Sequence, residues 1–268
     1  GNFNLHADEK STVQMLCGLT SQSEWTGVAV STLFREVGVK TNASWFLAEG
    51  SDAAVMTRSI PLEKAWDDAL IVYAQNGEAI RPEQGYPMRL LLPGWEGNTN
   101  IKWLRRLELS DAPFMTREET SKYTDSLQND TARQFSLVMD ARSVITTPTF
   151  PKILEKGWHE IRGLAWSGRG KIKTVEVSTN GGKTWRKAKL QGPVLPKAHT
   201  RFSLLWKWDG APAELSSRAM DETGYLQPTA TELIDARGSA NQVYHLNPIT
   251  SWVVQQSGEV IYKPEPWV

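Results

Sequence analysis

Residues 82–107, PEQGYPMRLLLPGWEGNTNIKWLRRL, constrain the fold more than any other stretch of this chain. A tight turn leads into the apolar run at residues 90–92, and a glycine-punctuated loop precedes three cations, Lys102, Arg105 and Arg106. Glycines let a backbone approach a ligand closely, and loop N–H groups beside fixed cations suit a phosphate or another anion. A buried strand with a connecting loop and a solvated positive edge would give the same pattern.

Length and composition limit the number of domains and the kinds of partner and metal site that the chain can have. The 268 residues suffice for two ordinary domains, and 30 basic residues balance 30 acidic ones, so charge favours neither nucleic acid nor an anionic membrane as partner. No apolar run approaches the roughly 20 residues that a spanning helix needs. The single cysteine, Cys17, excludes an internal disulfide and a multi-cysteine metal site, and we expect it to be an ordinary buried thiol. The four histidines are scattered, so no metal is assigned to them.

Up to about residue 110, helical and strand patterns alternate irregularly, as in a mixed α+β domain. Apolar residues at i, i+3, i+4 and i+7 predict a helix over residues 30–37, and the run WFLA at 45–48 predicts a buried strand. A second helix is predicted to begin near Ser59, with Pro61 in its first turn, and to end at Asn76-Gly77.

Beyond the polar stretch at residues 121–133, which predicts a connection between domains, the pattern changes to short strands with turn signals. Period-two alternation at 174–178 precedes the hairpin turn Asn180-Gly181-Gly182. Further strands are predicted at 202–208, 215–220 and 251–256, with one face of the first buried, and no helix is predicted after residue 135. This is the pattern of an all-β sandwich.

Three segments of the sequence resemble segments of a known protein family. QGYPMRLLLPGWEGNTNIKWLRRL (residues 84–107) resembles the pterin-binding segment of the sulfite oxidase family of molybdenum enzymes. VEVSTNGGKTW (175–185) resembles a signature of that family's second domain, and LQGPVLPKAHTRFSLLWKWDG (190–210) is similar to the family's sulfane dehydrogenase branch. The resemblance implies an α+β fold: a mixed α+β molybdopterin-binding domain at 1–132, lacking its start, followed by an immunoglobulin-like dimerisation domain at 133–268 that supports a homodimer.

The resemblance also implies where the metal ligand lies. In the family, one cysteine thiolate binds molybdenum two residues before a Gly-Asn pair, and this chain opens with Gly1-Asn2. The expected ligand therefore lies just upstream of residue 1. Cys17 stands some fifteen residues too late to match it, so no residue of this chain is assigned as a metal ligand.

Molybdenum–molybdopterin is the cofactor that the resemblance implies. The positions that match cofactor-binding positions of the family are Asp52, Gln84, Arg89, Asn100 and Lys102. Arginine offers planar bidentate contacts and lysine a point charge, whereas an aspartate that caps a turn would look the same as Asp52. Gln84 replaces a histidine common in sulfite oxidases, and its amide can donate a hydrogen bond but cannot titrate near neutrality.

Three residues match catalytic positions of the family. Trp25 corresponds to a tryptophan that lines the substrate pocket, Tyr123 to the tyrosine beside the metal centre, and Arg237 to a second-domain arginine that reaches an anionic substrate. A phenol there could hydrogen-bond an oxo ligand or relay a proton. The alternative roles are a core anchor for Trp25 and surface hydrogen bonds for Tyr123 and Arg237.

The resemblance implies molybdenum-dependent oxidation of sulfane sulfur on a carrier protein, with electrons passed to a cytochrome c subunit in the periplasm. Phe3-Asn4 occupies positions where sulfite oxidases carry arginines, which weakens the case for free sulfite because a small dianion needs several charge-assisted contacts. Two alternatives stay open: a sulfite dehydrogenase acting on free sulfite, and a non-catalytic assembly module with the same fold.

Overall fold

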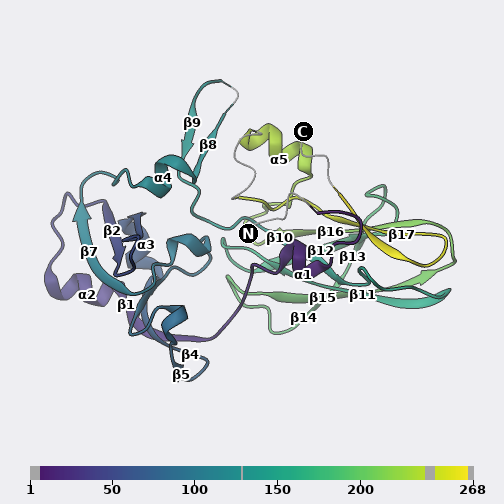
Figure 1. Ribbon diagram of the computed structural model, residues 1–268, viewed down its shortest axis with the longest axis horizontal. Helices are drawn as coiled ribbons and strands as arrows, with labels where there is room; N and C mark the ends of the chain where they lie inside the picture. The colour runs from purple at the N-terminus through teal and green to yellow at the C-terminus, as the bar shows by residue number, and fades with distance from the viewer. Residues whose placement is uncertain (1–6, 128, 239–244, 265–268) are drawn as a thin grey trace. The chain divides into compact units, whose positions relative to one another are not determined.

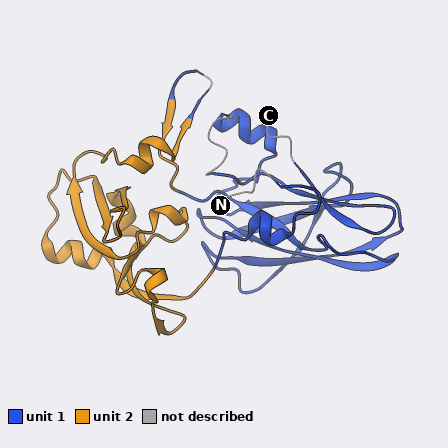
Figure 2. Ribbon diagram, viewed as in Figure 1, with its two compact units in different colours: residues 1–21, 126–131, 138–268 blue, residues 22–125, 132–137 orange. Residues whose placement is uncertain are grey.

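The structure, a computed structural model, describes residues 7–127, 129–238 and 245–264 (Figure 1). The chain divides into two compact units (Figure 2). The mixed unit comprises residues 22–125 and 132–137, and the two-sheet unit comprises residues 1–21, 126–131 and 138–268. The units interleave along the chain, whereas the division expected from the sequence, 1–132 and 133–268, is sequential.

Two small antiparallel sheets build the mixed unit. In the first, β4 (Leu70–Gln75) pairs with β1 (Trp25–Ala29), β5 (Glu78–Ala79) and β6 (Arg89–Leu91). In the second, β2 (Trp45–Gly50) lies between β3 (Thr57–Pro61) and β7 (Leu104–Ser110). The short elements are α2 (Val30–Val37), α3 (Leu62–Asp67), η1 (Pro82–Gln84), η2 (Gly97–Thr99), α4 (Arg117–Ser121) and the paired strands β8 (Thr124–Ser126) and β9 (Ala132–Gln134).

The core of the mixed unit forms where α2 covers apolar strand residues. Of the four residues on the predicted helical face, Val30 and Phe34 are buried, whereas Leu33 and Val37 are 39% and 66% exposed. The Phe34 ring meets that of Phe46 edge-on at 5.6 Å. The helix at 30–37 and the strand through 45–48 are thus confirmed. Leu90 and Leu92 belong to the same core, so the apolar run of the opening stretch is buried there.

The second predicted helix is wrong beyond residue 67. Residues 57–61 form β3, only Leu62–Asp67 are helical, and residues 70–75 form β4. Ile71 and Val72 are β-branched and favour a strand. Asn76 and Gly77 both have positive φ (52° and 81°), which makes the pair a hairpin turn into β5 rather than the end of a helix.

The two-sheet unit has one four-stranded and one five-stranded antiparallel sheet. The first runs in the order β10 (Arg142–Thr147), β11 (Gly157–Trp166), β15 (Thr200–Trp208), β14 (Lys189–Gln191). The second runs β13 (Arg186–Lys187), β12 (Ile172–Ser178), β16 (Ala213–Asp221), β17 (Ser251–Val254), β18 (Val260–Lys263). Two helices complete the unit, α1 (Val13–Cys17) and α5 (Ala230–Arg237).

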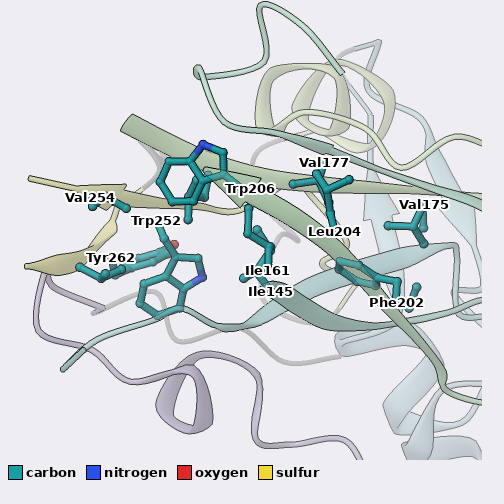
Figure 3. Packing of buried hydrophobic residues seen from close by; sticks show 14 of the residues in the cluster. Ile145, Ile161, Val175, Val177, Phe202, Leu204, Trp206, Trp252, Val254 and Tyr262 are labelled. Atoms are coloured by element: carbon teal, nitrogen blue, oxygen red, sulfur yellow. The ribbon is translucent and has the colours of Figure 1, made fainter. Parts of the chain in front are cut away.

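One hydrophobic cluster draws side chains from both sheets (Figure 3). Along β15, Phe202, Leu204, Trp206 and Trp208 are buried, which confirms the predicted buried face. Of the residues between them, Leu205 and Lys207 are exposed and Ser203 is buried. Val175 and Val177 of β12 belong to the same cluster, so the two sheets share one core. The immunoglobulin-like character of this unit stays a prediction.

The prediction that no helix follows residue 135 is wrong. Helix α5 begins with a capping box: the Thr229 side chain accepts from the Glu232 N–H, and the Glu232 carboxylate accepts from the Thr229 N–H. The sequence T-A-T-E at 229–232 has the pattern of a capping box. The helix is only weakly amphipathic, so its hydrophobic periodicity does not predict it. The helix ends at Arg237. No helix among the described residues is long and apolar enough to cross a membrane.

We predict that Phe202→Ala destabilises the two-sheet unit by about 3–5 kcal/mol, because it removes a ring that is 0% exposed at the centre of the core. Leu205→Ala on the same strand is the control, since Leu205 is 61% exposed and its loss should change stability by no more than about 0.5 kcal/mol. Urea denaturation of both variants measures the difference, and equal destabilisation would contradict the assigned faces of β15.

Candidate cofactor and active-site residues

The turn after η1 lies directly on the segment that enters β7. Gly85 has φ 109°, and a Cβ on it would lie 2.9 Å from Lys102 Cβ and 3.0 Å from the Trp103 nitrogen. Only glycine allows both the backbone conformation and this approach. The turn and the cationic segment of the opening stretch are therefore held together in the mixed unit.

Arg89 links the turn to the glycine-punctuated loop. Its Nη1 donates to the Gln84 carbonyl at 3.1 Å, and its Nη2 donates to the Asn100 carbonyl at 3.0 Å. Its Nε is buried and has no hydrogen-bond partner among the described residues. The Trp25 ring lies 5.3 Å from the guanidinium carbon, a cation–π distance. Four of the predicted site residues thus meet at this one guanidinium.

The charge of Arg89 is not balanced by a carboxylate among the described residues. Its hydrogen bonds go to neutral carbonyls, and burial lowers the pKa of Arg89 from its ordinary value. An arginine is still protonated after such a shift. A partly buried cation with a spare N–H donor suits an anionic group such as a phosphate.

The Asn100 side chain holds the loop rather than pointing to a ligand. Its Oδ1 accepts from the Leu92 N–H at 2.7 Å, and its Nδ2 donates to the Glu96 carbonyl at 3.0 Å. These bonds close the loop across residues 92–100 and aim the Asn100 carbonyl at Arg89. Asn100 therefore helps to hold the Arg89 side chain in position, a role that its place in the sequence did not reveal.

Lys102 and Asp52 border the same region. The exposed Lys102 ammonium donates to the Glu83 carbonyl at 2.6 Å, which leaves two of its three donors for another acceptor. The Asp52 carboxylate accepts from the Met56 N–H at 2.8 Å, the turn-capping role that was the alternative for it. Asp52 also lines a pocket of about 500 Å³ formed by residues 51–52, 86–88 and 103–105, which include the aromatic rings of Tyr86 and Trp103.

Tyr123 stands over a buried ion pair that the sequence analysis missed. The Arg58 guanidinium carbon lies 4.6 Å from the centre of the Tyr123 ring. Arg58 and Glu119 are both 0% exposed and pair through Arg58 Nε, and Glu119 also accepts from Thr116 and from the Ser59 N–H. Burial raises the pKa of Glu119, and the adjacent guanidinium opposes that rise. The arrangement fixes the position of the Tyr123 ring.

Arg237 belongs to the two-sheet unit and is engaged by a carboxylate. Its Nη2 donates to Asp140 Oδ2 at 3.0 Å. Asp140 also accepts from Arg169 and lies 2.9 Å from His245 Nε2. Neither Asp140 nor its other partners were identified from the sequence. The one available signal was a charged pair at the start of β10: Asp140 lies two residues before the strand, and Arg142 is its first residue.

Cys17 ends α1 and is partly buried against the core of the two-sheet unit. Its sulfur accepts from Arg142 Nη2 at 3.4 Å. Across the described residues, no group of three or more His, Cys, Asp or Glu side chains could hold a metal ion. Gly1-Asn2 and Phe3-Asn4, which bear on the expected upstream ligand and on free sulfite, lie outside the described residues.

The comparisons with known proteins agree with this geometry. The family described as "Oxidoreductase molybdopterin binding domain" matches residues 1–118, and that described as "Mo-co oxidoreductase dimerisation domain" matches residues 133–251. The crystal structure of the sulfane dehydrogenase SoxCD from Paracoccus pantotrophus is similar with a TM-score of 0.85 and 50% identity, over 90% of this chain and 62% of that one. The chain belongs to the sulfite oxidase family. It is a SoxC-like member of that family.

Curated relatives are more distant. Mitochondrial sulfite oxidase of Rattus norvegicus is 28% identical over 256 residues, which covers 85% of this chain and 46% of that protein. Nitrate reductase [NADH] 2 of Phaseolus vulgaris is 31% identical over 220 residues, or 70% of this chain and 24% of that protein. The chain thus spans less than half the length of these two relatives.

The family cofactor is molybdenum–molybdopterin, and the residues of the mixed unit fit it. The buried, unpartnered Nε of Arg89 and the remaining donors of Lys102 suit a phosphate. The pocket beside Asp52 combines aromatic walls with a carboxylate, which suits a flat, hydrogen-bonding ring system. In this family, Arg89 and Lys102 would hold the phosphate and Asp52 would bind the pterin.

We predict that Glu119→Ala destabilises the mixed unit by about 3–5 kcal/mol, because it leaves the Arg58 charge buried without its partner. Glu118→Ala is the matched control, since Glu118 neighbours it on α4, is partly exposed and has no side-chain contact of this kind among the described residues. Denaturant titration compares the two variants. Equal stability of Glu119→Ala and the parent protein would show that the pair does not hold this unit together.

Proposed function

We propose that this chain is the molybdenum subunit of a sulfane dehydrogenase, which oxidises sulfane sulfur bound to a carrier protein in bacterial sulfur oxidation. The observation that carries the proposal is the similarity to SoxCD, at 50% identity over 90% of the chain. That protein is a sulfane dehydrogenase, whereas the relatives named sulfite oxidase and nitrate reductase are similar at lower identity. The cofactor, when bound, would accept the electrons that leave the sulfur.

The protein's own part is to position cofactor and substrate. Arg89 and Lys102 would bind the cofactor phosphate, Gln84 and Asn100 would hold Arg89 in place through their carbonyls, and Asp52 would contact the pterin. Trp25, which packs on Arg89, would line the substrate pocket, and Tyr123 would donate a hydrogen bond beside the metal.

The partners follow from the same similarity. We propose a SoxD-like cytochrome c subunit as electron acceptor, in keeping with the two-component name SoxCD. A sulfur-carrier protein would present the substrate, and the dimerisation-domain match supports a homodimer through the two-sheet unit. The oxidation of the carrier-bound sulfur and the electron transfer to the cytochrome would both take place in the periplasm.

A second candidate is a sulfite dehydrogenase that acts on free sulfite, which the match to rat sulfite oxidase over 85% of the chain favours. The test is a steady-state assay of the complete, cofactor-loaded enzyme with each substrate, following cytochrome c reduction. Carrier-bound sulfane sulfur should give a kcat/KM about tenfold or more above that of free sulfite. Faster turnover of free sulfite would overturn the proposal, and turnover of neither would favour a non-catalytic assembly module.

We predict that Arg89→Met lowers the amount of pterin that co-purifies with the protein by about tenfold or more, because it removes the buried cation and its spare donor. Arg117→Met is the control, since it removes an exposed charge from α4 in the same unit. Fluorescence of the oxidised pterin, normalised to protein, gives the measurement. Full pterin content in a folded Arg89→Met variant would remove Arg89 from the cofactor site.

A further inference from the structure

The two-sheet unit contains a cluster in which three nitrogen-bearing side chains converge on one carboxylate. Asp140 is 4% exposed, and Arg169 donates to its Oδ1 through Nε at 3.0 Å and Nη2 at 2.6 Å. Its Oδ2 accepts from Arg237 Nη2 at 3.0 Å and lies 2.9 Å from His245 Nε2. Two arginines and a histidine around two oxygens form the donor set of an oxyanion site.

A second aspartate completes the charge balance. Asp221 is fully buried, accepts from the Ser167 hydroxyl at 2.7 Å, and is near enough to Arg169 to raise the pKa of that arginine together with Asp140. The charges of these two arginines and two aspartates cancel. Burial raises the pKa of Tyr225, whose ring lies 5.6 Å from Arg169, so this phenol adds no charge near neutrality.

Asp140 remains ionised in this setting. Burial alone would raise its pKa, but the hydrogen bonds and charges of His245 and Arg169 outweigh burial and hold the pKa of Asp140 well below its ordinary value. The carboxylate is therefore a permanent internal anion. It occupies the position where an external anion would meet the same donors.

We propose that Asp140 is an internal counter-ion that closes the Arg169–Arg237–His245 site to small free oxyanions. Arg169 is 41% exposed and Arg237 is 15% exposed, so solvent ions can reach the cluster, yet its donors already hold a carboxylate. A free dianion would have to displace the Asp140 carboxylate from these donors. Because Asp140 is part of the same chain, its effective concentration at the site is high. The site therefore binds sulfate or sulfite weakly in the parent protein.

The consequence for specificity rests on the proposed function. A dianion such as sulfite needs uncompensated cations, whereas sulfur attached to a carrier thiol brings less charge and depends on contacts made by its carrier. Asp140 would thus keep this cluster of the two-sheet unit closed to free sulfite. Anion binding itself can be measured without turnover, so its outcome does not depend on whether the chain oxidises sulfane sulfur.

The experiment is sulfate binding by isothermal titration calorimetry to the full-length protein and to Asp140→Ala and Asp140→Asn. Asp140→Ala should bind sulfate about tenfold or more tightly than the parent protein, and Asp140→Asn, which keeps the shape but loses the charge, should bind with intermediate affinity. Asp235→Ala removes an exposed carboxylate from α5 and should leave sulfate affinity unchanged. Adding Arg237→Gln to Asp140→Ala should abolish the gain.

Circular dichroism and the urea midpoint establish that each variant is folded. If Asp140→Ala does not fold, Asp140→Asn carries the test alone. The proposal is overturned if folded Asp140 variants bind sulfate no better than the parent protein, if the parent already binds it as tightly, or if Asp235→Ala produces the same gain.

Discussion

The arrangement of the mixed unit depends on one guanidinium that binds two carbonyls. Arg89 bridges Gln84 and Asn100 and so connects the turn at Gly85 with the loop that Asn100 closes. Removing a cation from water carries a cost that two neutral acceptors repay only in part, and the lowered pKa of Arg89 reflects that imbalance. A bound phosphate would correct it, which is why this interaction links the fold to the cofactor.

The two units use arginine in opposite ways. In the mixed unit, Arg89 and Lys102 have carbonyl acceptors and no carboxylate partner among the described residues, so they remain available to an anion. In the two-sheet unit, Arg169 and Arg237 bind Asp140 directly. The first arrangement suits the retention of an anionic cofactor, whereas in the second the cations are already paired with an internal carboxylate.

Much of the fold could be predicted where local pattern and tertiary packing agree. The helical spacing of Val30 and Phe34 and the alternation along β15 both follow from one buried face. Prediction failed at residues 70–75, where apolar residues fit a helical face but β-branched side chains and an Asn-Gly turn selected a strand. It failed at α5 because the capping box is its one strong signal.

The candidate site was predictable only in part. The family positions Trp25, Gln84, Arg89 and Asn100 do meet in the structure, because they lie on or beside strands of one unit. Arg58 and Glu119 are 61 positions apart, and Asp140 and His245 are 105 apart. No local pattern reports such pairs, since only the folded chain brings them together. The sequence shows that these side chains are ionisable, but it does not show which residues they pair with.

The most direct test of this account is the molybdenum and pterin content of the protein expressed from its full gene in a host that supplies the cofactor. Elemental mass spectrometry should find about one molybdenum per chain, together with an equal amount of pterin. A folded preparation with neither would contradict the account, because it would mean that Arg89 and Lys102 keep the family's geometry without binding its cofactor.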